Sequence, residues 1–167
     1  KFIKFHDKYE EYVTANFQAL TDALLPSANQ FGYGNSYDTN DLQVHDYVTD
    51  GLNRYITIQQ QLYQPSVPLA YPTAIMLDAA ATQLVNSHQV QPLPQALSAG
   101  GGMFSRLSRE DRLQTLYTLE NLGIDLYLLP PPFQNNGGMV KHVIVALNRF
   151  SMFGYYSEWP GYGSSRL

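Results

Sequence analysis

Five segments of the chain carry apolar residues at steps of three and four, and proline- or glycine-rich stretches separate these segments. Such steps place the apolar side chains on one face of an α-helix. No segment shows the sustained alternation of apolar and polar residues that marks a half-buried strand. The pattern therefore predicts an all-α fold, a single-domain bundle of about five helices with long irregular loops. The expected helices cover residues 5–25, 41–63, 73–88, 109–122 and 136–153.

Local signals mark several helix ends. Ser108 and Asp111 have the spacing of a capping box, in which a hydroxyl and an acid three residues later satisfy the first amides of a helix. Gly123 suits the end of that helix. We expect Asp41 to cap the second helix, and a bend or a close helix approach at Gly51, where glycine weakens the helix.

The segments between the helices are loop-like, and the last helix stands out. Residues 26–40, 64–72 and 89–104 are rich in proline, glycine or asparagine and are expected to be connectors. Within the third connector, the triplet Gly100–Gly102 indicates no more than a flexible hinge. The helix expected at 136–153 is the most apolar, and we predict that it is the central one.

Composition fits one domain, residues 1–167, and excludes several kinds of function. The chain is 44% apolar, which is enough to bury a core. Its net charge of −4 argues against nucleic-acid binding, which needs clustered basic groups. The absence of cysteine excludes disulfides, thiolate metal sites and cysteine nucleophiles. No apolar run approaches the roughly 20 residues that span a bilayer.

No motif in the chain names a reaction. There is no G-x-S-x-G elbow and no Walker loop, and the acids at 10–11 and 110–111 are typical of solvated helix positions. The four histidines lack the spacing of metal ligands on one helix: His6, His45, His88 and His142. We therefore predict that the chain alone is not an enzyme and binds no metal or cofactor. A small helical enzyme with His45 or His142 as a base remains an alternative.

The surface and the C-terminal tail point toward binding. Charged residues make up 14% of the chain, against about 25% in typical soluble domains. The tail at 154–167 is aromatic and glycine-rich, and its aromatic residues either dock into a partner or pack onto the core of this domain. Stacking on a sugar is a third interpretation, although nothing else indicates a glycan cleft. The predicted partner interface consists of Tyr155, Tyr156, Trp159, Tyr162 and Phe104.

Four segments, in order, resemble one protein family. They are the helix end Ala19–Pro26 (ALTDALLP), the helix start Val44–Val48 (VHDYV), the stretch Phe104–Arg112 (FSRLSREDR), and Gly154–Gly163 (GYYSEWPGYG). Together they resemble the gluconate 2-dehydrogenase subunit 3 family, and the resemblance covers most of the chain.

The resemblance implies a binding function. Members of that family are non-catalytic small subunits of large flavoproteins of the glucose–methanol–choline type. The large subunit holds FAD and oxidises a sugar or an alcohol, and some complexes add a haem cytochrome subunit. The small subunit supports the folding or the export of its partner, which implies a location outside the cytoplasm. Some relatives are linked to their partner by cysteines, so a link made by this cysteine-free chain is non-covalent.

A rival interpretation comes from a different class of protein. A self-assembling extracytoplasmic structural or surface protein would carry the same tyrosine- and amide-rich surface. Self-assembly gives homo-oligomers whose size depends on concentration, whereas an accessory subunit needs a second, larger polypeptide. A size measurement therefore distinguishes the two.

Overall fold

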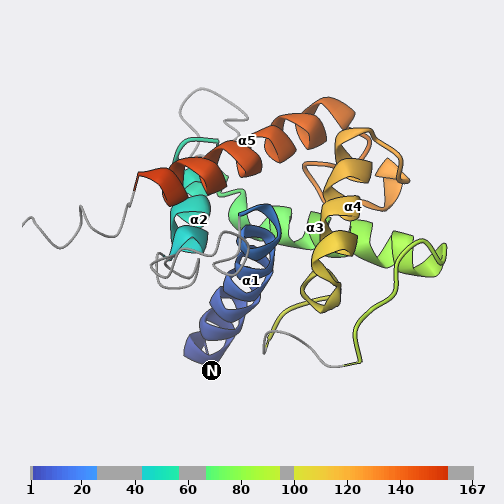
Figure 1. The fold of residues 1–167 in the computed structure, drawn as a ribbon. Coiled ribbons are helices and arrows are strands. Elements are labelled where there is room, and N and C mark those ends of the chain that lie inside the picture. Colours follow the sequence, from blue (N-terminus) through green and yellow to red (C-terminus); the bar gives the residue numbers. More distant parts are fainter. Residues whose placement is uncertain (1, 26–42, 57–66, 95–99, 158–167) are drawn as a thin grey trace, which may run out of the picture.

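A computed structural model of the chain describes residues 2–25, 43–56, 67–94 and 100–157 (Figure 1). These residues form helices and contain no strand, which confirms the all-α prediction. The α-helices are α1 (Phe2–Leu24), α2 (Val44–Arg54), α3 (Ala70–Asn86), α4 (Arg109–Glu120) and α5 (Gly137–Tyr156), and two short 3-10 helices are η2 (Phe104–Arg106) and η3 (Leu126–Leu128).

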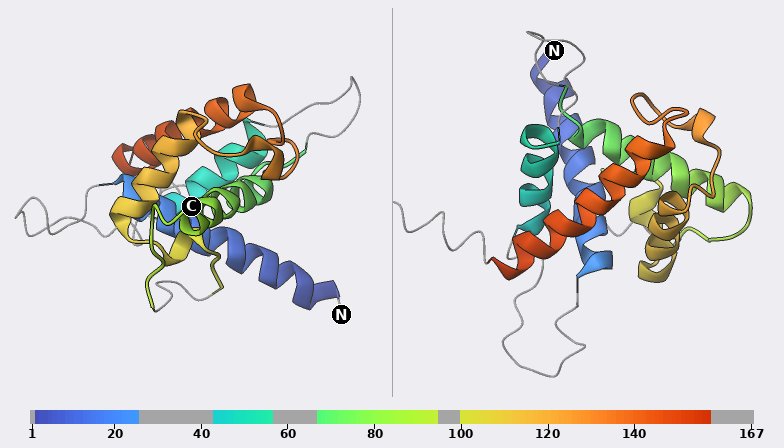
Figure 2. Two further views of the ribbon diagram at one scale, coloured as in Figure 1. Left: turned by 90° about the vertical axis from the view of Figure 1, so that its right-hand side faces the viewer. Right: turned by 90° about the horizontal axis from the view of Figure 1, so that it is seen from above.

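The first helix, rather than the last, takes the central place. Helix α1 contacts each of the other four α-helices as well as η2. Helix α5 lies across α2 and α4 and leaves Val145, Phe153 and Tyr156 exposed (Figures 1 and 2). The prediction that the helix at 136–153 is central is therefore wrong, because an apolar stripe does not reveal how many neighbours cover it. Fully buried side chains from all five α-helices fill the core, among them Phe17, Leu20, Leu52, Leu77, Leu119 and Val140.

Helix α4 begins and ends through the local chemistry expected of it. The Ser108 hydroxyl accepts a hydrogen bond of 3.2 Å from the amide of Asp111, which confirms the predicted cap. At the other end, Leu122 adopts a left-handed φ of 55°, and the Gly123 amide donates to the Thr118 carbonyl at 2.8 Å. Glycine thus follows the left-handed residue, as in a Schellman motif, and does not occupy the left-handed position itself.

Helices α2 and α3 differ from the prediction at their ends. Helix α2 ends at Arg54, well before residue 63, and the expected cap Asp41 lies outside the described residues. Helix α3 begins at Ala70, so Pro72 lies in its first turn. Amides in the first turn have no partner within the helix, so the amide hydrogen that proline lacks costs no helical hydrogen bond. The close approach expected at Gly51 is confirmed, since a Cβ there would lie 3.0 Å from the Phe150 ring of α5.

The glycine triplet packs tightly against its surroundings, which differs from the expected flexible hinge. A Cβ on Gly101 would lie 2.2 Å from the Ser105 hydroxyl. A Cβ on Gly102 would lie 1.7 Å from a carboxylate oxygen of Asp78. Gly101 and Gly102 therefore let the chain that leads into η2 pass directly over α3, and a side chain on Gly102 would disrupt this contact.

We predict that Gly102→Ala lowers the free energy of unfolding by about 1–3 kcal/mol, the usual effect of overpacking. The matched control is Gly138→Ala, because a Cβ on Gly138 would meet only Asn136 Oδ1, at 3.8 Å. Urea unfolding followed by circular dichroism measures both variants. Equal stability of the two would contradict the tight packing of Gly102 against Asp78.

Candidate functional site

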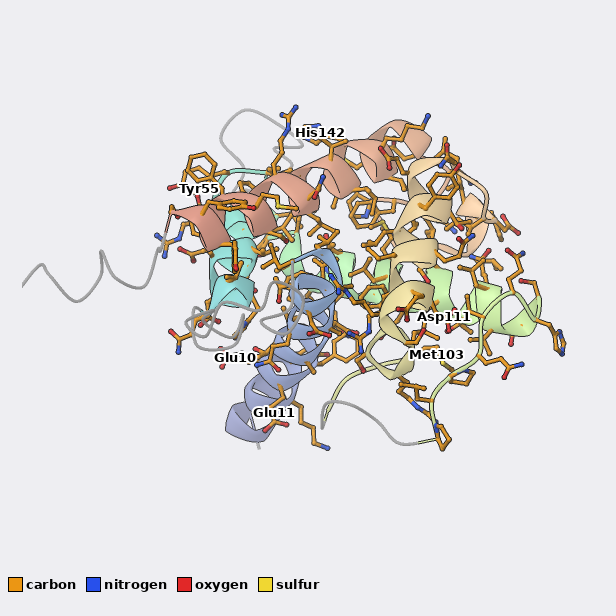
Figure 3. All side chains as sticks on the ribbon, viewed as in Figure 1. Glu10, Glu11, Tyr55, Met103, Asp111 and His142 are labelled. Atoms are coloured by element: carbon orange, nitrogen blue, oxygen red, sulfur yellow. The ribbon has the colours of Figure 1, made fainter. Side chains whose placement is uncertain are left out.

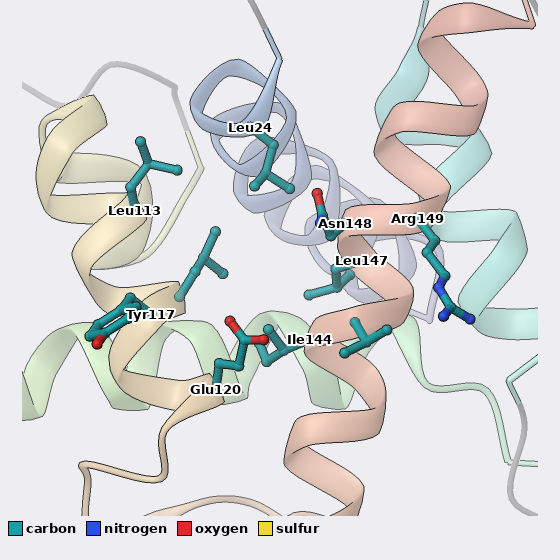
Figure 4. A pocket seen from close by; sticks show the side chains of 10 residues that line it. Leu24, Leu113, Tyr117, Glu120, Ile144, Leu147, Asn148 and Arg149 are labelled. Atoms are coloured by element: carbon teal, nitrogen blue, oxygen red, sulfur yellow. The ribbon is translucent and has the colours of Figure 1, made fainter.

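The α4–α5 groove is an apolar depression between these two helices, with a volume of about 280 Å³ (Figure 4). Its floor is formed by the buried side chains of Leu116, Ile144 and Leu147. Glu120 and Arg149 add charge to a lining that is otherwise apolar or neutral. The full lining is Leu24, Leu113, Leu116, Tyr117, Glu120, Ile144, Val145, Leu147, Asn148 and Arg149.

Helical spacing produces this combination of a buried floor and an exposed wall. Leu113, Leu116, Tyr117 and Glu120 follow one another at steps of three, one and three along α4, so they share one side of the helix. Leu116 turns inward, whereas Leu113 is 40% exposed and Tyr117 is 63% exposed. Val145 of α5 is also exposed beside the groove. Large apolar side chains gathered in one exposed place are typical of a binding surface.

A second depression, the α5 hollow, continues this surface toward the end of α5. It has a volume of about 540 Å³ and is lined by Asn148, Arg149, Met152, Phe153, Tyr156 and Ser157. Phe153 is 67% exposed and Tyr156 is 73% exposed. Asn148 and Arg149 line both depressions, so the α4–α5 groove and the α5 hollow adjoin one another.

The structure separates the residues predicted for the partner interface. Tyr156 lies in the α5 hollow, and Tyr155 packs on the core and meets the Tyr156 ring edge-on, with ring centres 5.2 Å apart. Trp159 and Tyr162 lie outside the described residues. Phe104 is fully buried, which corrects its assignment to the interface. Its amide donates to Asp78 Oδ1 at 2.8 Å. This hydrogen bond holds η2 against α3, and the Phe104 ring packs in the core.

The sequence analysis does not predict the exposure of Leu113, Tyr117 and Phe153, because each of them fits an apolar helical stripe. For Leu113 and Tyr117, the sequence of α4 contains a signal of this exposure. Its apolar residues lie at 113, 116, 117, 119 and 122, which spreads them around most of the helix circumference. A helix of this kind needs covering on more than one side. Helix α4 packs against α1, α3 and α5, and Leu113 and Tyr117 nevertheless remain exposed.

A partly buried polar cluster joins α1, α3 and η2 around the carboxylate of Asp78. The Tyr12 hydroxyl and the Asn16 side-chain amide donate to Asp78 Oδ2, and the Phe104 amide donates to Oδ1. Burial raises the pKa of Asp78 above its usual range, although these hydrogen bonds act in the opposite direction. Burial also raises the pKa of Tyr12, so the phenol keeps its proton at neutral pH. This arrangement suits a structural tie between three elements.

The histidines that could act as a base lie in different settings. His45 is buried on α2, with Nε2 3.5 Å from Asp46 Oδ1, and burial lowers its pKa. Asp46 lines a hollow of about 420 Å³ beside Tyr9 and Tyr71, but His45 is not part of that lining. His142 is exposed on α5, and Figure 3 shows it well apart from Glu10 and Glu11 of α1.

The described part of the chain shows neither a metal-binding cluster nor a membrane-spanning helix. Among its histidine, aspartate and glutamate side chains, no group of three or more is placed to hold a metal ion. None of its helices is both long enough and apolar enough to cross a lipid bilayer.

Comparison of the chain with family models, curated proteins and solved structures finds no match. The resemblance to gluconate 2-dehydrogenase subunit 3 therefore rests on the sequence motifs. The described parts of those motifs lie at the end of α1, the start of α2, the passage from η2 into α4, and the end of α5.

The raised pKa of Asp78 generates a pH-dependent prediction. The folded chain holds the Asp78 proton more tightly than the unfolded chain does, so the contribution of the protonated group is complete below about pH 4. It is lost as the pH rises through the folded-state pKa. The excess stability of the wild-type chain over Asp78→Asn should therefore be largest below about pH 4 and shrink toward neutral pH.

Urea unfolding of both proteins at a series of pH values measures this difference. An excess stability that grows with pH would contradict the prediction. It would mean that the hydrogen bonds to the carboxylate outweigh the effect of burial.

Proposed function

We propose that the chain is a non-catalytic accessory subunit that binds and stabilises a large FAD-dependent dehydrogenase of the glucose–methanol–choline type. The observation that carries the proposal is the pair of adjoining depressions, the α4–α5 groove and the α5 hollow, each with exposed apolar side chains in its lining. FAD belongs to the large subunit in this proposal, and the substrate is a sugar or an alcohol. The complex acts outside the cytoplasm, and a cytochrome subunit joins it in some members of the resembling family.

The groove has the composition of a protein interface. Leucine and tyrosine side chains line it beside its apolar floor, and Glu120 and Arg149, which are both exposed, are the charged residues of the lining. Interfaces of this type have an apolar centre and a polar rim, with tyrosine frequent among the residues that contribute most to affinity. Docking of the large subunit would remove Leu113, Tyr117 and Val145 from water and so stabilise the complex.

The resembling motif at 104–112 supports the proposal through the fold that it builds. Phe104 fills the core, Ser108 caps α4, and Arg112 binds α4 to α1. These contacts orient α4 so that its outer side faces the groove. The motif that resembles the small subunits would in this way keep the outer side of α4 available for docking.

We predict that Tyr117→Ala lowers the yield of the co-purifying flavoprotein about tenfold, because a buried interface tyrosine contributes more than about 1 kcal/mol. The matched control is Tyr127→Ala on η3, since Tyr127 is 64% exposed and Tyr117 is 63% exposed. The experiment is a pull-down from the native source, read by the mass of the captured polypeptide and its flavin absorption. Circular dichroism checks that both variants keep their helices.

Each other outcome has a definite meaning. Capture of a flavoprotein with equal yield by both variants would place the partner elsewhere on the chain. A colourless chain that binds copies of itself would contradict the accessory function and support a self-assembling structural protein. Turnover by the purified chain alone would contradict a non-catalytic role.

A further inference from the structure

The α1–α2 cleft is the hollow of about 420 Å³ that Tyr9, Asp46 and Tyr71 line together with other residues of α1, α2 and the start of α3. It shares no lining residue with the α4–α5 groove or the α5 hollow. Ligand sites of proteins begin at about 300 Å³, so the cleft has room for a small organic molecule.

Packed helices form the walls of the cleft. The lining residues of α2 are Asp46, Thr49 and Asn53, which follow one another at steps of three and four and so share one helix face. Asn53 Oδ1 accepts a hydrogen bond of 3.0 Å from the Ala70 amide, which fixes the start of α3 against α2. Because α1, α2 and α3 also pack on one another, a ligand would have to order few residues of this chain.

Two exposed tyrosine rings supply an aromatic wall. Tyr9 is 46% exposed and Tyr71 is 38% exposed, and their rings meet edge-on with centres 4.8 Å apart. The Tyr71 ring also meets that of Tyr12, whose hydroxyl donates to Asp78. Neighbouring rings thus hold Tyr71 in place. The face of a tyrosine ring is electron-rich and attracts cations.

The charge of the lining favours the same kind of ligand. Glu10 and Asp46 are acidic, and none of the described residues that line the cleft is basic. Next to Asp46, His45 Nε2 lies 3.5 Å from Oδ1, but burial lowers the pKa of His45, so this imidazole adds little positive charge at neutral pH. A carboxylate beside aromatic rings attracts a cation and repels an anion.

The walls suit an organic cation better than a metal ion. In the described part of the chain, no group of three or more histidine, aspartate and glutamate side chains is placed to hold a metal. An alkylammonium group needs fewer ligands, because its charged head binds one carboxylate while its methylene groups cover an aromatic ring.

We propose that the α1–α2 cleft binds an alkylammonium group, with the charged head at Asp46 and the alkyl part against the rings of Tyr9 and Tyr71. The group belongs either to a free amine or to a lysine side chain of another protein. This site is separate from the proposed docking surface, and its ligand does not depend on the accessory function.

Titration with n-butylammonium chloride, followed by amide shifts in NMR spectra of the whole chain, tests the proposal. We expect saturable shifts at residues of the cleft, and 1-butanol, which has the same alkyl chain without the charge, should bind at least about fivefold more weakly. N-acetyl-lysine methylamide is the second probe. Tighter binding of this probe than of n-butylammonium would assign the site to a lysine side chain, and the reverse would assign it to a free amine.

Variants locate the charge and the ring. Asp46→Asn should weaken the binding of n-butylammonium about fivefold, as expected for the loss of an exposed ion pair. Asp50→Asn is the matched control, because Asp50 is a similarly exposed acid of α2 that pairs with Arg54 and does not line the cleft. Tyr9→Leu should weaken binding about threefold through the loss of a cation–π contact. Tyr55→Leu, which changes an exposed ring outside the lining, should leave binding unchanged.

Four results would overturn the proposal. They are the absence of saturable shifts at the cleft, equal binding of 1-butanol and n-butylammonium, equal effects of Asp46→Asn and Asp50→Asn, and shifts at the cleft with methyl glucoside but not with n-butylammonium. The last result would assign the cleft to a neutral sugar. These measurements need no flavoprotein, so their failure is distinct from that of the pull-down.

Discussion

Two arginines of α4 bind the end of α1, and the arrangement of the other elements depends on this contact. The last carbonyls of a helix have no partner within it. Arg109 donates to two carbonyls at this end, those of Ala23 and Leu25, at 3.1 and 2.9 Å. Arg112 donates to the carbonyl of Ala19, about one turn earlier in α1, at 3.1 Å. These positive side chains also suit the negative end of the α1 dipole.

Arg112 is 1% exposed, so its charge has to be compensated inside the protein. Arg112 Nη1 also donates to Asp22 Oδ2 at 3.0 Å, and Nη2 donates to the Ser105 carbonyl at 3.3 Å. Ser105 belongs to η2, and the neighbouring Phe104 amide holds Asp78 of α3. A single side chain therefore connects α4, α1 and η2, and through η2 it reaches the Asp78 cluster. Removing it would delete the hydrogen bonds to Ala19, Asp22 and Ser105 and so disconnect α4 from α1 and η2.

The same contact decides which side of α4 faces outward. With Arg112 directed at α1, helical geometry turns Leu116 and Leu119 inward as well. Leu113 and Tyr117 then have to point away from the core, and α5 packs beside them to form the groove. The exposed side of α4 that forms the groove is therefore a consequence of the buried Arg112. The groove is built from side chains of two packed helices, α4 and α5. Binding of a partner there would therefore cost little conformational entropy in this chain.

Features encoded by neighbouring residues could be predicted from the sequence, and those decided by distant contacts could not. The helical class and the Ser108 cap follow from spacing over a few residues, and the structure has both. Phe104 was placed on a surface loop because nothing local reveals that Asp78, 26 residues earlier, binds its amide. Tyr156, which the sequence analysis places in the interface for its aromatic surroundings, lines the α5 hollow. Tyr117 lies within an apolar stripe that is typical of core residues, so its exposure could not be predicted. Amphipathic spacing reports that a side chain is apolar, but only the packing of α1, α4 and α5 determines whether this protein or a partner covers it.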